Sequence, residues 1–365
     1  MRLRTTAYQM TLQLKRYLPR FHKAHHANLA TMVVGMALGR SVCLPRIAEN
    51  AVVGRAVQLE SRVQRFERVL QSALFVPMLV LGPVAIRLLR WMHRHGDDLV
   101  IVMDRSMIND TLNLLHVAVA FHGRALPLGW IRVPHDGASD LDLQESILRW
   151  VHFLVPDGAR VTIIADREFH SIHLARFIAE DLGWSFILRI KRKTQVEYTA
   201  GCWFDAARLA VRGRRIQYRD VRVTRHATAL RVNVVTAWEA TESEPWLLIT
   251  NLDSATDTVE TYAKRFWIEE MFSDHKKRAF DLEATRINEP DRLERLLVAV
   301  ALAYLWTMQV GAFVVATDQW RVVDNRGAKP TVSLCQHGLR WIKHQLIHGF
   351  LPPAFTLNFP LLDNG

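Results

Sequence analysis

The chain has 365 residues, half of them hydrophobic, so it is long enough to bury a large core in two or three domains. Its three cysteines are odd in number and widely spaced, which argues against a disulfide framework or a cysteine-based zinc site and fits a reducing cytoplasm. No apolar run occurs before residue 29, so the first residues are not expected to be a secretory signal.

The net charge of +11 is unevenly distributed. Residues 1–95 carry 15 basic and 3 acidic side chains, and residues 189–231 carry 12 and 3, whereas the segments 96–188 and 232–365 are acidic on balance. Basic segments neutralise phosphates and release their counterions. The two basic blocks therefore indicate a nucleic-acid partner, and the acidic segments are where carboxylates for a divalent metal are expected.

Residues 1–95 are predicted to be helical. Apolar residues recur at helical spacing between residues 12 and 18 and again between residues 57 and 74. Arg62 and Arg65 also recur near helical spacing, which favours a basic helix face lying against a duplex; a solvated helix is the alternative. We expect residues 1–95 to form a helical DNA-binding domain.

From residue 96 the pattern changes to buried strands with helices between them. Strands are predicted at 99–103, 116–122, 126–133, 161–165 and 184–190, and helices at 140–153 and 171–182. Three strands, a helix, a strand, a helix and a strand indicate the α/β class, a mixed sheet flanked by helices. Residues 96–190 would then be the first part of a core domain.

The remainder of the chain divides into three further segments. Residues 191–245 alternate in short β-like runs and carry most of the second basic block, which predicts an inserted β-rich subdomain. Residues 246–250 should return to the core sheet, so that 246–316 is the second part of the core and 317–365 a tail with one helix.

One segment is apolar enough to raise the question of a membrane span. Leu296–Ala316 carries no charge and is long enough to cross a bilayer. Its residues Tyr304, Trp306 and Gln309 suit a core helix equally well. We therefore expect a buried helix and no membrane span.

Two aspartates each follow a buried strand. Asp104 ends the run at 99–103, and Asp166 ends the run at 161–165. Side chains at strand ends can leave the core and meet a substrate at the edge of a sheet. Asp98 and Asp110 are nearby rivals, together with Asp97, but their surroundings are typical of turns.

A third carboxylate lies in the stretch YAKRFWIEEMFSDHK, residues 262–276. If this stretch is one helix, Tyr262, Arg265, Glu269 and Lys276 share one narrow stripe within about 60° around the axis. The rest of the helix is largely apolar, so the stripe should face a cleft. A salt-bridged surface helix is the alternative.

The pattern Y-x2-R-x3-E-x6-K in this stretch resembles the signature of one class of bacterial insertion-sequence transposases with an RNase H-like catalytic fold. The resemblance implies that Asp104, Asp166 and Glu269 form the DDE triad of that class. Hard oxygen ligands select Mg²⁺, with Mn²⁺ as a substitute. Two such ions would activate a water and stabilise the leaving 3′ oxygen in an in-line displacement at phosphorus.

Further residues are expected to contact DNA. Arg265 and Lys276 would hold phosphates beside the cut, and Tyr262 would hydrogen-bond to one. The second basic block adds three consecutive cations, Lys191, Arg192 and Lys193. In the class it resembles, cleavage often involves a base flipped onto an aromatic side chain; Trp203 and Trp238 could serve, although a core position is the favoured interpretation of each.

The resemblance predicts a transposase. It would bind the terminal inverted repeats of its element as double-stranded DNA, cleave the ends and join them to target DNA, as a dimer assembled on DNA and associated with the bacterial nucleoid. Two alternatives remain: a nuclease of the same fold that cuts without strand transfer, and a non-catalytic DNA-binding descendant.

Overall fold

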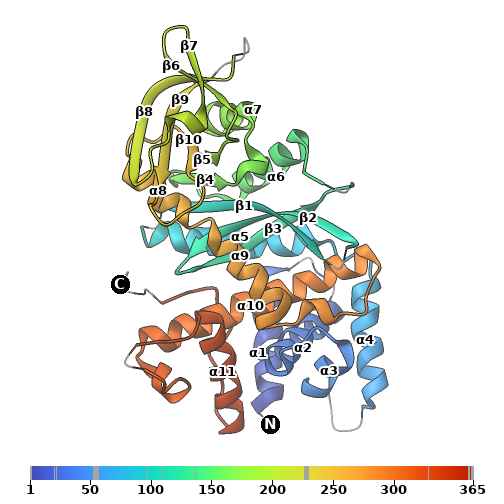
Figure 1. Cartoon of the computed structure of the whole chain (residues 1–365). Helices are drawn as coiled ribbons and strands as arrows, with labels where there is room; N and C mark the ends of the chain where they lie inside the picture. Colours follow the sequence, from blue (N-terminus) through green and yellow to red (C-terminus); the bar gives the residue numbers. More distant parts are fainter. Residues whose placement is uncertain are drawn as a thin grey trace.

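The computed structural model describes residues 2–19, 21, 23–51, 57–96, 98–108, 110–135, 137–225, 230–327, 329–360 and 362. The first 95 residues are helical, as the periodicity predicts. Their helices are α1 (Arg2–Tyr17), α2 (Lys23–Gly39), α3 (Leu44–Asn50), α4 (Leu59–Gln71) and α5 (Pro77–Arg94). They lie beneath and behind the sheet in Figure 1.

The core begins with three antiparallel strands followed by two parallel ones. These are β1 (Leu99–Ile108), β2 (Leu112–Phe121), β3 (Arg124–Arg132), β4 (Val161–Ala165) and β5 (Ser185–Arg189), with α6 (Leu141–Leu154) and α7 (Ile172–Arg176) between the later strands. β1 pairs antiparallel with β2 and parallel with β4, and β4 pairs parallel with β5. The predicted mixed α/β sheet is therefore present.

The insert extends this sheet instead of forming a sheet of its own. Its strands are β6 (Gln195–Thr199), β7 (Cys202–Asp205), β8 (Arg214–Val223) and β9 (Leu230–Trp238). β10 (Trp246–Thr250) pairs with β5 on one side and with β9 on the other, so the ten strands run in the order β3-β2-β1-β4-β5-β10-β9-β8-β6-β7. In Figure 1 the inserted strands form the upper end of the molecule.

The remaining helices are α8 (Ala255–Ala263), α9 (Phe266–Ser273), α10 (Pro290–Ala316) and α11 (Leu334–Ile347). α10 is the longest and nearly every residue in its second half is buried. It is also the one described helix long and apolar enough to cross a membrane, and 89% of its most apolar window lies inside the protein, as expected of a core helix. The helix pair Ala24–Gly39 and Leu44–Asn50 would pass the same test only as one broken span, bent by 91°.

Two adjacent residues of β3 show which helices cover which face of the sheet. A Cβ placed on Gly129 would lie 2.6 Å from the ring of Trp150 on α6. Trp130 points the other way, and its indole donates to Glu294 on α10. α5 shares the first face, because Gly82 also lies against Trp150. α9 shares the second face with α10, because Phe272 contacts His116, which packs on Trp130.

Candidate active site

The register of the parallel pair β1 and β4 brings two of the predicted carboxylates together. Met103 pairs with Ala165, so Asp104 and Asp166 are the next residues on adjacent strands. β1 does not end there, however: it continues to Ile108 through antiparallel pairing with β2, in which Asp104 faces His116. The prediction that Asp104 ends its strand is therefore wrong. Asp104 does, however, directly follow the last residue of β1 that pairs with β4.

Asp104 and His116 lie on the sheet face covered by α9, the helix that carries Glu269. Arg265 lies between the two carboxylates. Its guanidinium donates to Asp104 Oδ2 at 3.4 Å and to Glu269 Oε1. The Arg265 side chain is only 9% exposed, whereas that of Glu269 is 52% exposed, so the site opens toward solvent on the Glu269 side.

The electrostatics of Asp104 reflect this crowding. Burial raises the pKa of the Asp104 carboxyl to about 7, and the negative charges of Asp166 and Glu269 act in the same direction. The backbone N–H of Arg105 and the charge of Arg265 act in the opposite direction but do not cancel the effect. The charge of Arg265 thus offsets only part of the effect of burial on the Asp104 carboxyl.

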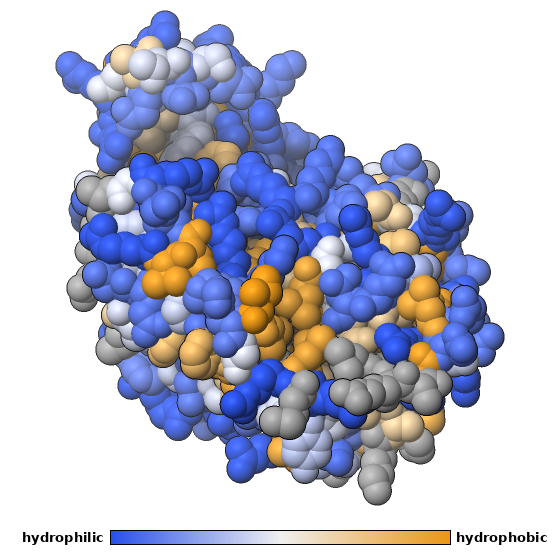
Figure 2. Space-filling model, turned by 90° about the horizontal axis from the view of Figure 1, so that it is seen from below, coloured by the Kyte–Doolittle hydropathy of each residue, from blue (hydrophilic) through white to orange (hydrophobic). Residues whose placement is uncertain are grey.

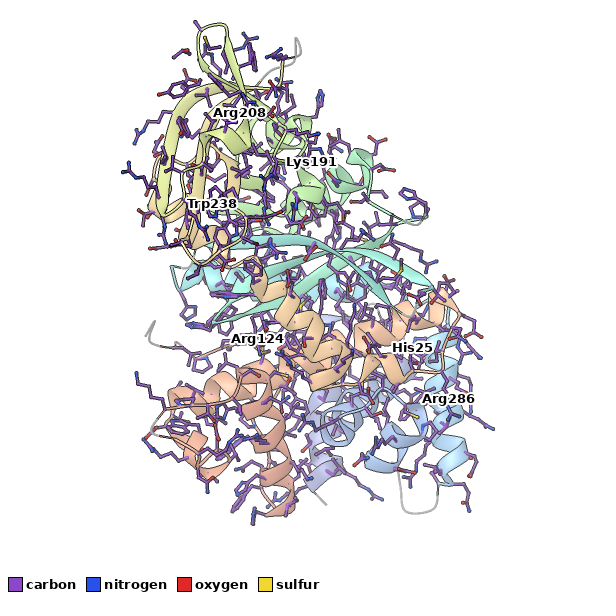
Figure 3. All side chains as sticks on the ribbon, viewed as in Figure 1. His25, Arg124, Lys191, Arg208, Trp238 and Arg286 are labelled. Atoms are coloured by element: carbon purple, nitrogen blue, oxygen red, sulfur yellow. The ribbon has the colours of Figure 1, made fainter. Side chains whose placement is uncertain are left out.

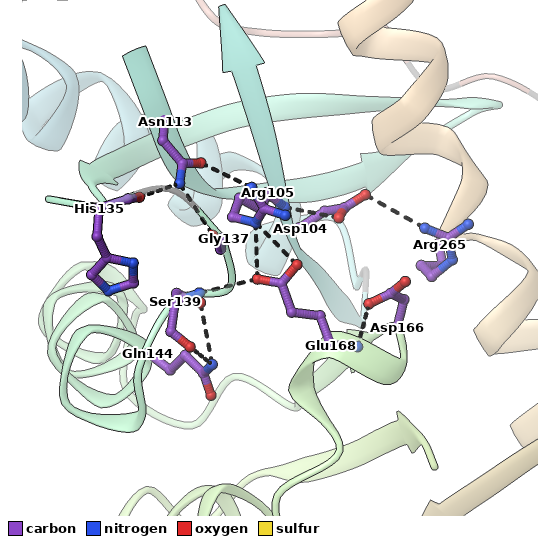
Figure 4. Close-up of polar contacts among 10 residues, drawn as sticks. All are labelled: Asp104, Arg105, Asn113, His135, Gly137, Ser139, Gln144, Asp166, Glu168 and Arg265. Atoms are coloured by element: carbon purple, nitrogen blue, oxygen red, sulfur yellow. Dashed lines mark hydrogen bonds and ion pairs between the residues drawn. The ribbon is translucent and has the colours of Figure 1, made fainter. Parts of the chain in front are cut away.

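A second ion pair fastens the two aspartate-bearing segments on the other face of the sheet (Figure 4). Arg105 donates through Nε to both carboxylate oxygens of Glu168, at 3.1 and 3.0 Å, and through Nη1 to Asn113 at 3.2 Å. Glu168 also accepts from the backbone N–H of Ser139. Asp166 in turn accepts from the backbone N–H of Glu168 at 2.8 Å, which caps the short helical turn after β4.

The predicted continuous helix over residues 262–276 is wrong. α8 ends at Ala263, and residues 264–268 make tight i→i−3 bonds such as Arg265 N–H to the Tyr262 carbonyl at 2.9 Å. α9 then ends at Ser273 in a wide π-helical turn, Asp274–Arg278. Each change alters the angle between successive side chains, so the side-chain positions calculated for one regular helix do not apply.

The position of Lys276 follows from the π-helical turn. It lines a small hollow with Ser106, His116 and His275, and burial lowers the pKa of its ammonium. Within the described part of the chain, no ion pair joins Lys276 to any of the three predicted catalytic carboxylates.

Tyr262 is likewise not at the surface. Its side chain is fully buried, its ring meets Trp246 edge-on at 5.0 Å between centroids, and burial raises its pKa to about 12. Arg265 and Asp166 also act on this pKa, which places the hydroxyl beside the carboxylates. The geometry therefore suits a supporting role for Tyr262 better than direct contact with a phosphate.

The other predicted DNA contacts are distributed over the molecule. Lys191, Arg192 and Lys193 are exposed after β5, and Lys193 lines a cleft of about 470 Å³ with His170, just past Asp166. Lys191 and Trp238 lie in the upper, β-rich part of the molecule (Figure 3). Trp203 is half-buried, with Arg222 and Arg225 each 5.7 Å from its ring centre, and Trp238 donates to the Glu242 carbonyl.

In the N-terminal helices the two predicted arginines differ. Arg62 donates to the carbonyls of Ala48, Ala51 and Val57, so it holds α3 and α4 together. Arg65 is exposed on the same helix and available to a ligand.

The oxygen donors at the site suit a hard divalent cation, because all three groups are carboxylates. In the described residues, however, no three His, Cys, Asp or Glu side chains converge closely enough to hold a metal ion. Arg265 lies between Asp104 and Glu269 instead. The donor chemistry fits; the present arrangement is that of carboxylates neutralised by an arginine.

A comparison with known protein families identifies the family to which this chain belongs. A sequence profile described as the transposase DDE domain matches residues 95–306, more than half of the chain. The chain belongs to the transposase DDE-domain family. It is thus an enzyme of DNA cleavage and strand transfer, and the matched segment contains Asp104, Asp166 and Glu269.

Among solved structures, the transposase is similar to one described as a piggyBac transposase synaptic complex with hairpin DNA. The TM-score is 0.46 and the sequence identity 10%, over 99% of this chain and 84% of that chain. No match was found among curated protein sequences.

Several residues around the carboxylates were not predicted from the sequence. Glu168 and Asn113 complete the Arg105 ion-pair network, and Trp246 packs on Tyr262. Glu168 has a weak sequence signal, since it lies two residues after Asp166. Asn113 has none, because its role depends on the pairing of β1 with β2.

Proposed function

We propose that the protein binds the terminal inverted repeats of an insertion sequence, cleaves its ends and joins them to target DNA, with Asp104, Asp166 and Glu269 as the catalytic carboxylates. The observation that carries this proposal is the juxtaposition of Asp104 and Asp166 at the end of the β1–β4 parallel pairing, with Glu269 reached through Arg265. The family membership supplies the reaction class.

The three carboxylates would hold Mg²⁺ or Mn²⁺, which when bound supplies charge stabilisation and an activated water for displacement at phosphorus. For them to share a cation, the guanidinium of Arg265 has to leave the space between Asp104 and Glu269. Arg265 is then placed to donate to a phosphate, for which its planar fork is suited. Because the pKa of Asp104 is raised, binding of a cation there should also release protons at and below neutral pH.

The remaining residues hold and orient the DNA. Lys193 lines the cleft that contains His170, four residues after Asp166, and the charge of Lys191 acts on the pKa of the same histidine, so both lysines would bind phosphates of the end being cut. Tyr262 is buried near Arg265 and Asp166, whose charges act on its pKa, and would support the site without contacting DNA. Arg65 is one of the exposed arginines of α4, the helix predicted to turn a basic face toward DNA. Recognition of double-stranded ends by a dimer follows from the same proposal.

The test is cleavage of labelled repeat ends, taken from the DNA flanking the gene, in the presence of Mg²⁺ and a target plasmid. Asp104→Asn, Asp166→Asn and Glu269→Gln should each lower the cleavage rate by roughly 1,000-fold or more, the scale of losing a charge-stabilising group. End binding, measured by gel shift, should remain. Asp98→Asn is the matched control, because Asp98 pairs only with Arg160 near the start of β1.

Near-normal cutting by one of the three variants would remove that residue from the triad. If the unaltered protein gave cut ends but no joined product, the protein would be a nuclease. If it bound ends and cut none under any divalent cation, it would be a non-catalytic descendant.

A further inference from the structure

A basic cleft lies on the other side of the sheet from the carboxylates. It has a volume of about 480 Å³ and lies between α1 and α5, with Pro156 after α6 at its rim. Five of its nine lining residues are basic and none is acidic; the basic ones are Arg16, Arg87, Arg90, His93 and Arg94.

The arginines of this cleft form a row. Arg87, Arg90 and Arg94 are spaced i, i+3 and i+7 on α5, so they project from one face of the helix. They extend over about 10 Å at 1.5 Å per residue. A row of this length can follow a short stretch of one phosphate backbone, on which each nucleotide carries one negative charge.

The charge of the row is not neutralised within the protein. Among the ion pairs of the described residues, none involves Arg16, Arg87, Arg90 or Arg94. All four side chains are exposed. Burial raises the pKa of Tyr17 at the cleft floor, and the charges of Arg87 and Arg16 act against it. Four arginines that share one concave surface repel each other unless an anion lies between them.

The cleft is also held in shape. Arg87 donates to the Thr356 carbonyl and lies over the Tyr17 ring at 5.0 Å from its centre. Tyr17 in turn donates to the Phe355 carbonyl at 3.1 Å. Three segments far apart in the sequence, α1, α5 and residues 355–356, thus fix one arginine, and the others line the cleft beside it.

We propose that this cleft binds the phosphate backbone of a second stretch of duplex DNA, distinct from the stretch held at Asp104, Asp166 and Glu269. α5 lies on the Gly129 face of the sheet, and the carboxylates lie on the Trp130 face under α9. DNA has a persistence length of about 150 base pairs, so one straight duplex does not contact both faces. The contact is to phosphates and carries no base specificity. This inference rests on the protein acting on DNA.

The test uses the full-length protein with Arg16→Gln, Arg90→Gln and Arg94→Gln combined. Arg87 is left in place because it holds Tyr17 and Thr356. The matched control changes three exposed cations of the C-terminal part, Arg321, Lys329 and Lys343, to glutamine. Affinity is measured against salt concentration for a short terminal-repeat duplex and for a long random duplex added to the preformed end complex.

The cleft variant should lower the slope of log affinity against log salt by about 2 to 3 for one of the two duplexes, since each lost phosphate contact removes about 0.9. A lower slope with the random duplex assigns the cleft to target DNA. A lower slope with the repeat duplex assigns it to a second part of the transposon end. The control should keep both slopes. Unchanged slopes in the folded cleft variant, or equal loss in the control, would overturn the proposal.

Cleavage of the repeat duplex, measured in the same samples, separates this proposal from the catalytic one. The cleft variant should cut a saturated repeat end at the normal rate, because none of its three arginines lies near the carboxylates. The two proposals can therefore fail independently. In the cleft variant, a lower salt slope with a normal cleavage rate supports DNA binding by the cleft. A normal salt slope overturns DNA binding by the cleft, whatever the cleavage rate.

Discussion

Asp166 and Glu168 are two residues apart, yet they have different surroundings. Asp166 is close enough to Asp104 and Tyr262 for its charge to raise the pKa of both, whereas Glu168 pairs with Arg105, which lies on the opposite face of the sheet from Asp104. Because Arg105 follows Asp104 and Glu168 follows Asp166, this ion pair ties together the two strand ends that present the aspartates (Figure 4). We infer that this ion pair keeps the spacing of the two aspartates constant.

We predict that Glu168→Gln lowers the single-turnover rate of end cleavage by about 10- to 100-fold and leaves end binding unchanged, because a small shift of a positioned group costs that much in rate. The free energy of unfolding should fall by about 1–2 kcal/mol, a value reduced for partial exposure since the two side chains are 26% and 19% exposed. The matched control is Glu145→Gln, which removes the more exposed pair with Arg149 on α6.

A double-mutant cycle distinguishes positioning from general destabilisation. Arg105→Gln and Glu168→Gln should be non-additive in cleavage rate, because either change alone releases the same link. Additive losses, or losses in cleavage that follow the melting temperature of the variants, would show that Glu168 acts only through stability.

At the scale of elements, the sequence predicts where strands lie better than it predicts where helices break and which way their side chains point. The apolar runs before Asp104 and Asp166 correctly predicted two strands, because a run of buried residues bounded by an aspartate leaves few other structures. The break at Lys264 and Arg265 was not predictable, because every residue there favours a helix. It is tertiary contacts, the ion pairs of Arg265 with Asp104 and Glu269, that accompany the tightened turn.

Long-range pairing limits prediction in the same way. The alternating pattern of residues 191–245 predicted strands, and strands are present. Alternation does not say which edge a strand joins, so the continuation of the core sheet from β10 through β9 to β7 could not be foreseen. The direction of the arginine row on α5 could not be foreseen either, since it depends on which face of α5 packs on β3.

The contact between α10 and α11 gives a prediction that belongs to this scale. The two helices approach so closely that a Cβ on Gly338 would lie 1.8 Å from the carbonyl oxygen of Thr307. A Cβ on Gly311 would lie 1.8 Å from the carbonyl oxygen of Leu334. Gly338→Ala should therefore force the helices apart and lower the free energy of unfolding by about 1–3 kcal/mol or more.

Gly82→Ala is the matched control, because Gly82 also lies inside a helix but a Cβ there meets Trp150 at an ordinary 3.7 Å. It should be neutral or stabilising by up to about 1 kcal/mol, since alanine favours a helix more than glycine does. Denaturant unfolding measures both. Equal effects of the two substitutions would mean that the α10–α11 contact relaxes without cost.

On the scale of the whole molecule, the N-terminal helices and the catalytic part share one continuous hydrophobic core. Arg295 on α10 donates to the carbonyls of Leu70 and Phe75, at the turn between α4 and α5. Arg40 after α2 donates to the Arg278 carbonyl and to Gln336 on α11. Seen from below, apolar side chains appear only as small patches between polar ones (Figure 2).

Because of this shared core, we predict that a protein truncated to residues 96–365 does not fold by itself. Removing α5 would expose the face of β3 on which it packs, and removing α2 and α4 would expose part of α10. The net stability of a typical domain is only about 5–15 kcal/mol, so losing this burial should leave the fragment unfolded. Calorimetry and near-UV circular dichroism should show no cooperative transition for the fragment.

A role of residues 1–95 in recognising the transposon ends must therefore be tested in the full chain. Arg65→Gln with Arg68→Gln removes two exposed charges of α4 and leaves Arg62, which holds α3, in place. This variant should melt at the normal temperature and lose preference for repeat ends over random duplex. A fragment 96–365 with a cooperative transition would show that the N-terminal helices are a separate domain, and normal end preference in the arginine variant would place recognition elsewhere than on α4.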